Sequence, residues 1–202
     1  MKRFILALII ILFVYACGSV SDGESGSSFE SVRLFVSGSN IEGGVYKADS
    51  VVQAYDNGTC ANDSDNYTYT TDEVTVNVKS EALPNLPSDL ELAEVEVYNI
   101  IVSFIPNDDI SPEVPTKEYS KIYSIQPNST MSIPVIIIDE SDKSDSGSDW
   151  YYQKLDNDTK TESYNYIVNI KFKAEERWYG GTDSFSYKFN LTYSDLDDDC
   201  TK

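Results

Sequence analysis

The three cysteines carry the side chains that could do the most distinctive chemistry in this sequence. A thiol can be acylated, can pair in a disulfide, or can bind a metal as a thiolate. Cys17 stands between an apolar run and a stretch of Gly and Ser, whereas Cys60 and Cys200 stand far apart in the chain. Two distant thiolates fall short of the four ligands that a structural zinc site needs, so we expect no metal site at the cysteines.

The sequence contains no histidine, and this absence removes several classes of active site. Ser-His-Asp and Cys-His triads, histidine metal sites and histidine acid-base catalysis all need the missing side chain. No glycine-rich phosphate loop follows a strand and opens a helix. A hydrolase acting through two carboxylates stays open as a less favoured alternative, because 34 Asp and Glu residues must include close pairs. We therefore expect neither an enzyme nor a cofactor.

The first residues predict where the protein is found. Lys2 and Arg3 precede an apolar run over residues 4–14, which is the layout of an export signal. The run is shorter than the roughly 20 apolar residues that a membrane-crossing helix needs, so a removable signal is the better interpretation. In an exported chain, Cys60 and Cys200 are most simply interpreted as one disulfide.

Residues 14–17, with the sequence Val-Tyr-Ala-Cys, resemble the lipobox of bacterial lipoproteins. The resemblance implies diacylglycerol on the Cys17 sulfur, removal of a signal peptide over residues 1–16, and a further acyl chain such as palmitate on the freed amine. Gly18 follows Cys17, where many lipoproteins of the inner membrane carry Asp, so the resemblance implies the outer membrane, on its periplasmic or its surface face. The alternative is an ordinary signal peptide cut near Ala16.

Gly and Ser dominate residues 18–28, the composition of a flexible linker. Residues 17–28 are therefore predicted to be the lipidated cysteine and a tether, whose typical reach is roughly 18 Å. Residues 29–202 are then expected to form one folded domain. Pro84 and Pro87 predict a loop, so a subdivision near residues 83–89 stays open.

The chain carries a net charge of −19. Such a surface repels nucleic acid and anionic lipid headgroups, because phosphate binding depends on clustered Lys and Arg. The acidic residues are dispersed among Tyr, Val and Ile, which favours a solubilising field over an acidic interaction tail. The expected partners are the membrane, through the lipid on Cys17, and an unidentified protein or glycan, but not nucleic acid.

Apolar and polar residues alternate with period two through most of the chain, which is the pattern of half-buried strands. The clearest runs are 164–174 and 185–193, separated by Gly180 and Gly181, and they predict a long β-hairpin. The other predicted strands are 31–36, 50–55, 67–80, 95–105, 118–125, 132–138 and 149–155, with residues 89–97 interpreted as strand with a loose start. We expect an all-β antiparallel sandwich of about nine strands and no helix.

The hairpin sequence AEERWYGGTDSFSY, the loop IPNDDISPEVP and the alternation of Tyr, Val and Ile look like an immunoglobulin-like domain of a bacterial surface lipoprotein. The resemblance runs from about residue 30 to 194 and implies an immunoglobulin-like β-sandwich. It implies no catalytic or binding residues. The cysteine-tryptophan-cysteine arrangement of true immunoglobulin domains is absent.

Two aromatic sites and two acidic loops are candidates for recognition. Trp178 and Tyr179 fall at the predicted hairpin tip, where they could stack on a sugar or a protein, although folding back over the sandwich is favoured. Trp150 is expected to pack in the core. A Cys60–Cys200 disulfide would join two loops rich in Asp, which predicts a weak calcium site, with solvated side chains as the favoured alternative. The carboxylates of these loops are those of Asp56, Asp63, Asp65, Asp195, Asp197, Asp198 and Asp199.

These observations together predict a membrane-anchored bacterial lipoprotein with a non-catalytic structural or binding β-sandwich module. The alternative is a carbohydrate- or calcium-binding surface domain. The carboxylate-based hydrolase is the less favoured third interpretation.

Overall fold

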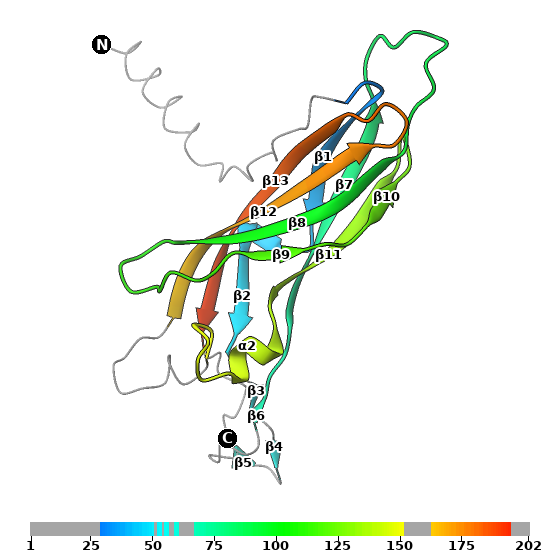
Figure 1. The fold of residues 1–202 in the computed structure, drawn as a ribbon. Coiled ribbons are helices and arrows are strands. Elements are labelled where there is room, and N and C mark those ends of the chain that lie inside the picture. Colours follow the sequence, from blue (N-terminus) through cyan, green and yellow to red (C-terminus); the bar gives the residue numbers. More distant parts are fainter. Residues whose placement is uncertain are drawn as a thin grey trace, which may run out of the picture.

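The computed structural model describes residues 29–50, 68–151 and 163–194, together with the backbone of residues 52–53, 55–56, 59–60 and 67. Two β-sheets pack against each other around a shared hydrophobic core (Figure 1). The predicted all-β sandwich is therefore confirmed. The finer assignment to immunoglobulin-like sandwiches stays a prediction.

The small sheet is antiparallel and has the order β1-β7-β11. Its strands are β1 (Val32–Ser39), β7 (Asp72–Ala82) and β11 (Thr130–Ile138). The large sheet has the order β10-β8-β12-β13-β2, and β9 also pairs with β8. Its strands are β2 (Val45–Asp49), β8 (Val95–Pro106), β9 (Lys117–Tyr119), β10 (Tyr123–Ile125), β12 (Ser163–Glu176) and β13 (Thr182–Ser194). The pairing of β2 with β13 is parallel.

Alternate residues of the two sheets meet in the core, as the period-two pattern predicts. Val76 of β7 and Ile170 of β12 are fully buried. Phe172 of β12 stacks on Phe185 of β13 with ring centroids 4.9 Å apart. Each large apolar side chain buried in this way contributes about 1.5–3 kcal/mol. The remaining alternate residues of each strand are left to form the outer faces of the sandwich.

The predicted hairpin is the longest strand pair in the described structure. The register of β12 and β13 runs from Ser163 opposite Ser194 to Glu175 opposite Thr182. Gly180 closes the turn with φ 68°, a left-handed conformation that glycine adopts without a Cβ penalty. The hairpin is therefore a continuous platform for any side chains on its outer face.

Several strand boundaries differ from the sequence prediction. The predicted strand 67–80 begins at Asp72 after the short β6 (Tyr67–Thr68), and 118–125 is divided into β9 and β10. The division has a physical cause: β9 pairs with residues 100–102 of β8 and β10 with residues 95–97, so the gap falls where β8 carries a bulge. The described part of 89–97 before Val95 is loop rather than strand.

The segment predicted as a strand over 50–55 is the least accurate part of the expected fold. The regular strand is β2, which ends at Asp49 where its parallel pairing with β13 ends. Short pieces follow it, namely β3 (Val52–Gln53), β4 (Tyr55–Asp56) and β5 (Thr59–Cys60). Period-two alternation records strand propensity but does not record which segment finds a partner.

The expectation that the chain has no helix is wrong at two short segments. A 3-10 turn, η1 (Glu42–Gly44), precedes β2, and α2 (Glu140–Ser144) follows β11. Asp139 caps α2 by accepting from Ser141 N, in a capping box with Asp142. A helix this short shows little periodicity in the sequence and depends on its cap and its tertiary contacts.

The structure agrees with part of the sequence prediction for Trp150 and with the predicted loop at Pro84 and Pro87. Trp150 is buried in the core, as predicted, with its ring centroid 5.2 Å from that of Tyr193. It lies in a turn, however, and no strand passes through residues 149–151. Pro84 and Pro87 lie in the loop that leads from β7 of the small sheet to β8 of the large sheet.

Candidate functional site

Lysines gather on the outer face of the large sheet. Lys171 and Lys173 point outward from β12, while Lys188 on β13 and Lys47 on β2 point to the same side. The register places Lys188 opposite Asn169, Lys171 opposite Ser186, and Lys173 opposite Ser184. We call the surface formed by Lys47, Lys171, Lys173 and Lys188 the lysine face.

The lysine face differs from the rest of the described surface in its lack of ion pairs. In the residues that the structure describes, none of these four lysines forms a salt bridge with a carboxylate. The other described cations, with the exception of Lys121, are each paired, namely Arg33, Lys79, Lys117, Lys143 and Arg177. In a chain of net charge −19, four unpaired cations on one face are a local concentration of positive charge that can attract an anionic group.

A shallow hollow of about 300 Å³ lies at one end of the lysine face. Its lining residues are Tyr98, Lys171, Lys173, Thr182, Asp183 and Ser184. Tyr98 reaches this surface because β8 bulges there: Lys173 pairs with Asn99 and Ala174 with Val97, which leaves Tyr98 as the extra residue. The Tyr98 side chain is 39% exposed, so its ring is available to a ligand.

Two amide oxygens on the same face have no hydrogen-bond partner. Asn99 Oδ1 and Asn169 Oδ1 are both buried and unbonded, while Asn99 Nδ2 donates to Glu118 Oε1. Buried acceptors without a donor are uncommon in native proteins because each one costs desolvation free energy. The face therefore presents ammonium donors and an aromatic ring, and the two unbonded oxygens are buried beneath it.

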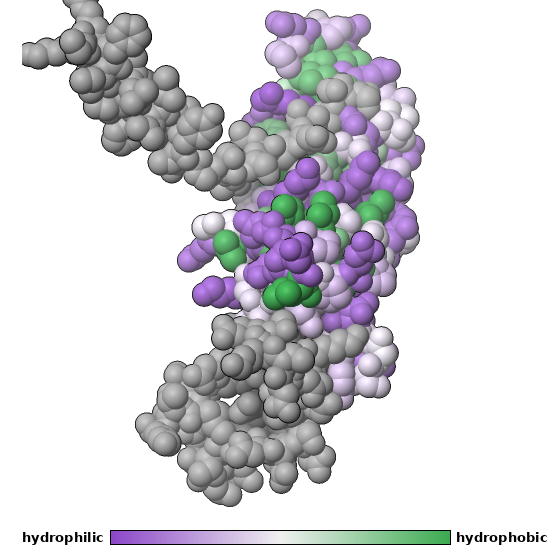
Figure 2. Space-filling view, turned by 90° about the vertical axis from the view of Figure 1, so that its left-hand side faces the viewer, coloured by the Kyte–Doolittle hydropathy of each residue, from purple (hydrophilic) through white to green (hydrophobic). Residues whose placement is uncertain are grey.

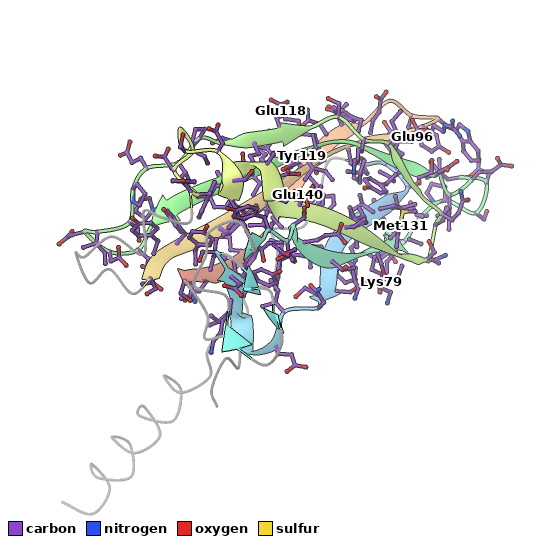
Figure 3. The ribbon with its side chains drawn as sticks, turned by 90° about the horizontal axis from the view of Figure 1, so that it is seen from below. Lys79, Glu96, Glu118, Tyr119, Met131 and Glu140 are labelled. Carbon is purple, nitrogen blue, oxygen red and sulfur yellow. The ribbon has the colours of Figure 1, made fainter. Side chains whose placement is uncertain are left out.

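Two carboxylates at the β8 side of the lysine face, those of Glu96 and Glu118, are already engaged. Glu96 Oε1 pairs with Arg177 Nη2 at 3.1 Å, and Glu118 accepts from Asn99. Seen from below, Glu96 and Glu118 lie along one side of the molecule, and Lys79 of the small sheet lies on the other (Figure 3). Carboxylates thus border the lysine face on its β8 side.

The described surface does not offer a large apolar docking patch on the side shown in Figure 2, where hydrophobic residues form small separate groups among hydrophilic ones. The most exposed hydrophobic side chains are Ile105, Ile110, Ile122 and Trp178. They come from different loops and strands. Polar recognition is therefore better supported than hydrophobic docking.

A buried polar network occupies the other end of the sandwich. Lys143 of α2 is fully buried, and its Nζ lies 2.8 Å from Asp72 Oδ2. It also donates to the Asp49 carbonyl oxygen, while Tyr46 Oη donates to Asp72 Oδ1 over 3.2 Å. Burial raises the pKa of Asp72, although Lys143 opposes the shift, and burial together with Asp72 also raises the pKa of Tyr46. A network enclosed in this way is suited to holding α2 in place rather than to binding a ligand.

The predicted site residues fall mostly outside the described part of the chain. Cys17 and Cys200 lie outside it, and of Cys60 the backbone alone is described, in β5. The predicted disulfide, the lipidation and the acidic calcium loops at Asp56, Asp63, Asp65, Asp195 and Asp197–Asp199 therefore stay predictions. Among the described residues, no group of three or more His, Cys, Asp or Glu side chains is placed to hold a metal ion.

The two residues of the hairpin tip behave differently. Tyr179 folds back, and its hydroxyl donates to the Glu91 carbonyl oxygen over 2.9 Å. Trp178 is 61% exposed, so the favoured interpretation that the tip aromatics cover the sandwich applies to Tyr179 and not to Trp178. Three of the four lysines, Lys171, Lys173 and Lys188, are visible in the sequence as the polar half of the alternating pattern. The position of Lys47 and the missing ion pairs need three-dimensional information.

Comparison with known proteins adds no assignment to this geometry. A scan against protein-family models finds no match, and a search of the curated proteins finds none either. Within the described ranges, the helices are too short or too polar to span a membrane.

Proposed function

We propose that the protein is a membrane-anchored bacterial lipoprotein whose β-sandwich is a binding module, with the lysine face as its binding surface. The observation that carries the binding role is the gathering of four unpaired lysines on one face of a strongly acidic chain. The anchor is inferred from the signal-like residues 2–14 and the lipobox-like residues 14–17. Such a module holds a partner near the membrane without transforming it.

The contacts around residue 29 support a tethered design. Phe29 is buried in the core, and the Glu176 carboxylate accepts hydrogen bonds from Glu30 N at 2.7 Å and Ser31 N at 2.9 Å. The chain is therefore fastened to the long hairpin immediately after the predicted tether. A lipid on Cys17 would hold the sandwich near the membrane while leaving the lysine face free to meet a partner.

Carbohydrate binding is the favoured form of this function, because the hollow beside Tyr98 combines an aromatic ring with polar groups. Calcium binding rests on residues outside the described ranges and is the weaker alternative. The carboxylate hydrolase is the third, since the described lysine face supplies cations and amides rather than a pair of opposed carboxylates.

The anchor is tested by changing Cys17→Ala in the full chain and separating membrane from soluble fractions of the bacterium. Loss of the lipid should move the protein to the soluble fraction. A variant that stays with the membrane would contradict the lipoprotein proposal.

The binding surface is tested by capture of partners from solubilised membranes with the wild type and with a variant that carries Lys→Gln at all four positions of the lysine face. Capture should be lost in this variant and should weaken with added salt, since the attraction is electrostatic. The matched control is Lys121→Gln, which removes an unpaired described lysine elsewhere. Equal capture by all three proteins would show that the lysine face is not the binding surface.

A further inference from the structure

We infer that the hollow beside Tyr98 binds an acidic saccharide, a sugar ring that carries a carboxylate or a phosphate. The inference rests on the proposed binding role of the lysine face and names its ligand class. The hollow of about 300 Å³ lies at the lower end of the volumes of small-molecule sites, and this size suits one ring of a longer chain.

The charge of the ligand follows from Lys171 and Lys173. These residues are two apart on β12 and point to the same side, so their Cα atoms lie about 7 Å apart. Both line the hollow, and neither forms an ion pair in the described structure. Two ammonium groups bring six N–H donors to one small area, and this arrangement favours a carboxylate or phosphate between them.

Two asparagines lie near the lysines in the register but do not line the hollow. Asn99 lies opposite Lys173 in the register, and Asn169 lies opposite Lys188. Their Oδ1 atoms are buried and lack a donor. Because these oxygens are buried, a ligand in the hollow does not reach them, and the hydroxyl groups of a sugar are expected to meet Ser184, which does line the hollow.

The apolar part of a sugar ring has a partner in Tyr98. The bulge in β8 pushes this side chain out of the regular alternation, and it lines the same hollow as the lysines. An aromatic ring at the side of a polar hollow packs against the C–H groups of a sugar ring. Ser184 also lines the hollow and brings a hydroxyl group to it.

The extent of the positive surface argues against a larger polyanion. Asp183 lines the hollow, and Glu96 and Glu118 bound the face at the β8 edge. With the net charge of −19, these carboxylates repel a bilayer of anionic lipids or a nucleic acid, both of which present closely spaced charges. A single acidic residue within an otherwise neutral polysaccharide avoids most of this repulsion.

The test uses the full lipidated protein in neutral detergent on an array of acidic glycans and their neutral counterparts. Acidic glycans should bind and their neutral counterparts should not. Titration of a bound glycan should show affinity lower by about tenfold to a hundredfold in the Lys171→Gln, Lys173→Gln double variant, because two charge-assisted contacts are lost. Tyr98→Ala should weaken binding about threefold to tenfold, and Lys121→Gln should leave it unchanged.

The inference is overturned if no acidic glycan binds, if neutral glycans bind equally, or if the double variant binds as the wild type does. Vesicles of phosphatidylglycerol serve as the competing surface for the Cys17→Ala protein without detergent, because the acyl chains of the lipidated protein would insert into any bilayer. Binding of this unlipidated protein to the vesicles as strong as its binding to acidic glycans would also overturn the inference. Failure of the inference is distinguishable from failure of the proposed function. A protein that captures membrane partners through its lysine face but binds no acidic glycan keeps the function and loses the saccharide.

Discussion

Lys143 is a charged side chain that the fold encloses completely. Sequence alone places it in the segment ESDKSDS, which is typical of an exposed loop. The structure instead uses its ammonium group to join three elements, through Asp72 of β7, the Asp49 carbonyl oxygen of β2, and its own helix α2. A buried cation is tolerated because each of its partners is an oxygen that the fold holds in place.

Replacing Lys143 should destabilise the protein strongly. In Lys143→Met the Asp72 carboxylate stays buried without its cation, and breaking such a pair costs about 3–5 kcal/mol. Urea denaturation measures the loss, with Lys121→Met, at an exposed lysine, as the control. The double variant Lys143→Met, Asp72→Leu should recover most of the stability, since an apolar pair can replace a buried ion pair. A neutral single variant would show that the pair is dispensable.

The Asp108 carboxylate, in the loop after β8, is stabilised in its ionised form by hydrogen bonds. Its Oδ1 accepts from Ser111 N at 2.7 Å and Ile110 N at 3.2 Å, and its Oδ2 accepts from Asn165 Nδ2 at 2.9 Å. Hydrogen bonds, first from Ser111 and then from Asn165, hold the pKa of Asp108 below its ordinary value of 3.8. A carboxyl with a lowered folded-state pKa adds stability above its unfolded value and loses it as the pH falls through the folded value.

The change Asp108→Asn should therefore lower the free energy of unfolding at neutral pH, and this loss should become smaller in acid. We expect a loss of about 1 kcal/mol at pH 7, kept small by solvent screening of a partly exposed group. The difference from the wild type should narrow below about pH 4. Melting temperatures of both proteins between pH 2 and 7 measure it, with the exposed neighbour Asp109→Asn as the control. A difference that is constant with pH would contradict an ionic role.

At the scale of elements, Glu176 fastens the start of β1 to the end of β12. It is fully buried, and besides the amides of Glu30 and Ser31 it accepts from the Ser31 hydroxyl. The same hydroxyl accepts from Ala93 N at 2.9 Å. One carboxylate thus joins the chain after the predicted tether to the hairpin and to the loop before β8.

Glu176→Gln should loosen this junction. The amide nitrogen of Gln cannot accept, so at least one backbone N–H loses its partner, at a cost of about 1–3 kcal/mol. Glu175→Gln is the matched control, because its exposed side chain lies on the opposite face of the same strand. Hydrogen exchange at Glu30 and Ser31 should accelerate in the first variant and not in the second. If the amides of Glu30 and Ser31 stay equally protected from exchange in both variants, the packing of Phe29 rather than Glu176 holds the chain at this junction.

How far the sequence predicts an element depends on where that element gets its stability. The β12–β13 hairpin was predictable because alternation and the turn glycines are local signals. Neither α2 nor the parallel pairing of β2 was, because α2 depends on a buried ion pair and β2 on a partner more than 140 residues away. The positions of Lys171, Lys173 and Lys188 were predictable as the polar side of the hairpin, whereas Lys47 lies in β2, over which no strand was predicted. The lack of ion pairs was not predictable, since Lys173 and Glu175 share a face of β12 without forming a salt bridge.

At the scale of the whole molecule, the two ends of the sandwich have different contacts. The Glu176 junction and the hairpin turn share one end, and α2 with the short strands β3, β4, β5 and β6 lies at the other (Figure 1). A lipid at Cys17 would therefore place the junction end toward the membrane and α2 away from it. Lys171 and Lys173 precede Glu176 on the same strand, β12, by only a few residues. The inferred saccharide site would therefore lie in the half of the sandwich nearer the membrane.

The end away from the junction is where the predicted Cys60–Cys200 disulfide would form. The last residues of β2 and β13 lie side by side there, with Asp49 opposite Ser194 and Ser50 N donating to Ser194 O over 2.9 Å. Cys200 follows Ser194 by six residues and Cys60 follows Ser50 by ten. Segments of these lengths can extend about 20 Å or more, which is ample to bring two Cα atoms within the roughly 7 Å that a disulfide requires.

The crosslink would act on the whole domain because it closes a loop of about 140 residues, for which the chain-entropy model gives about 5 kcal/mol. Reduction should then lower the melting temperature by about 10–20 °C. The double variant Cys60→Ser, Cys200→Ser should melt at the lower temperature with or without reductant, which separates loss of the bond from other effects of the reductant. Mass analysis of the unreduced protein shows whether Cys60 and Cys200 are paired. Two free thiols at these positions would exclude the bond. The melting temperature of the wild type should then also be insensitive to reductant.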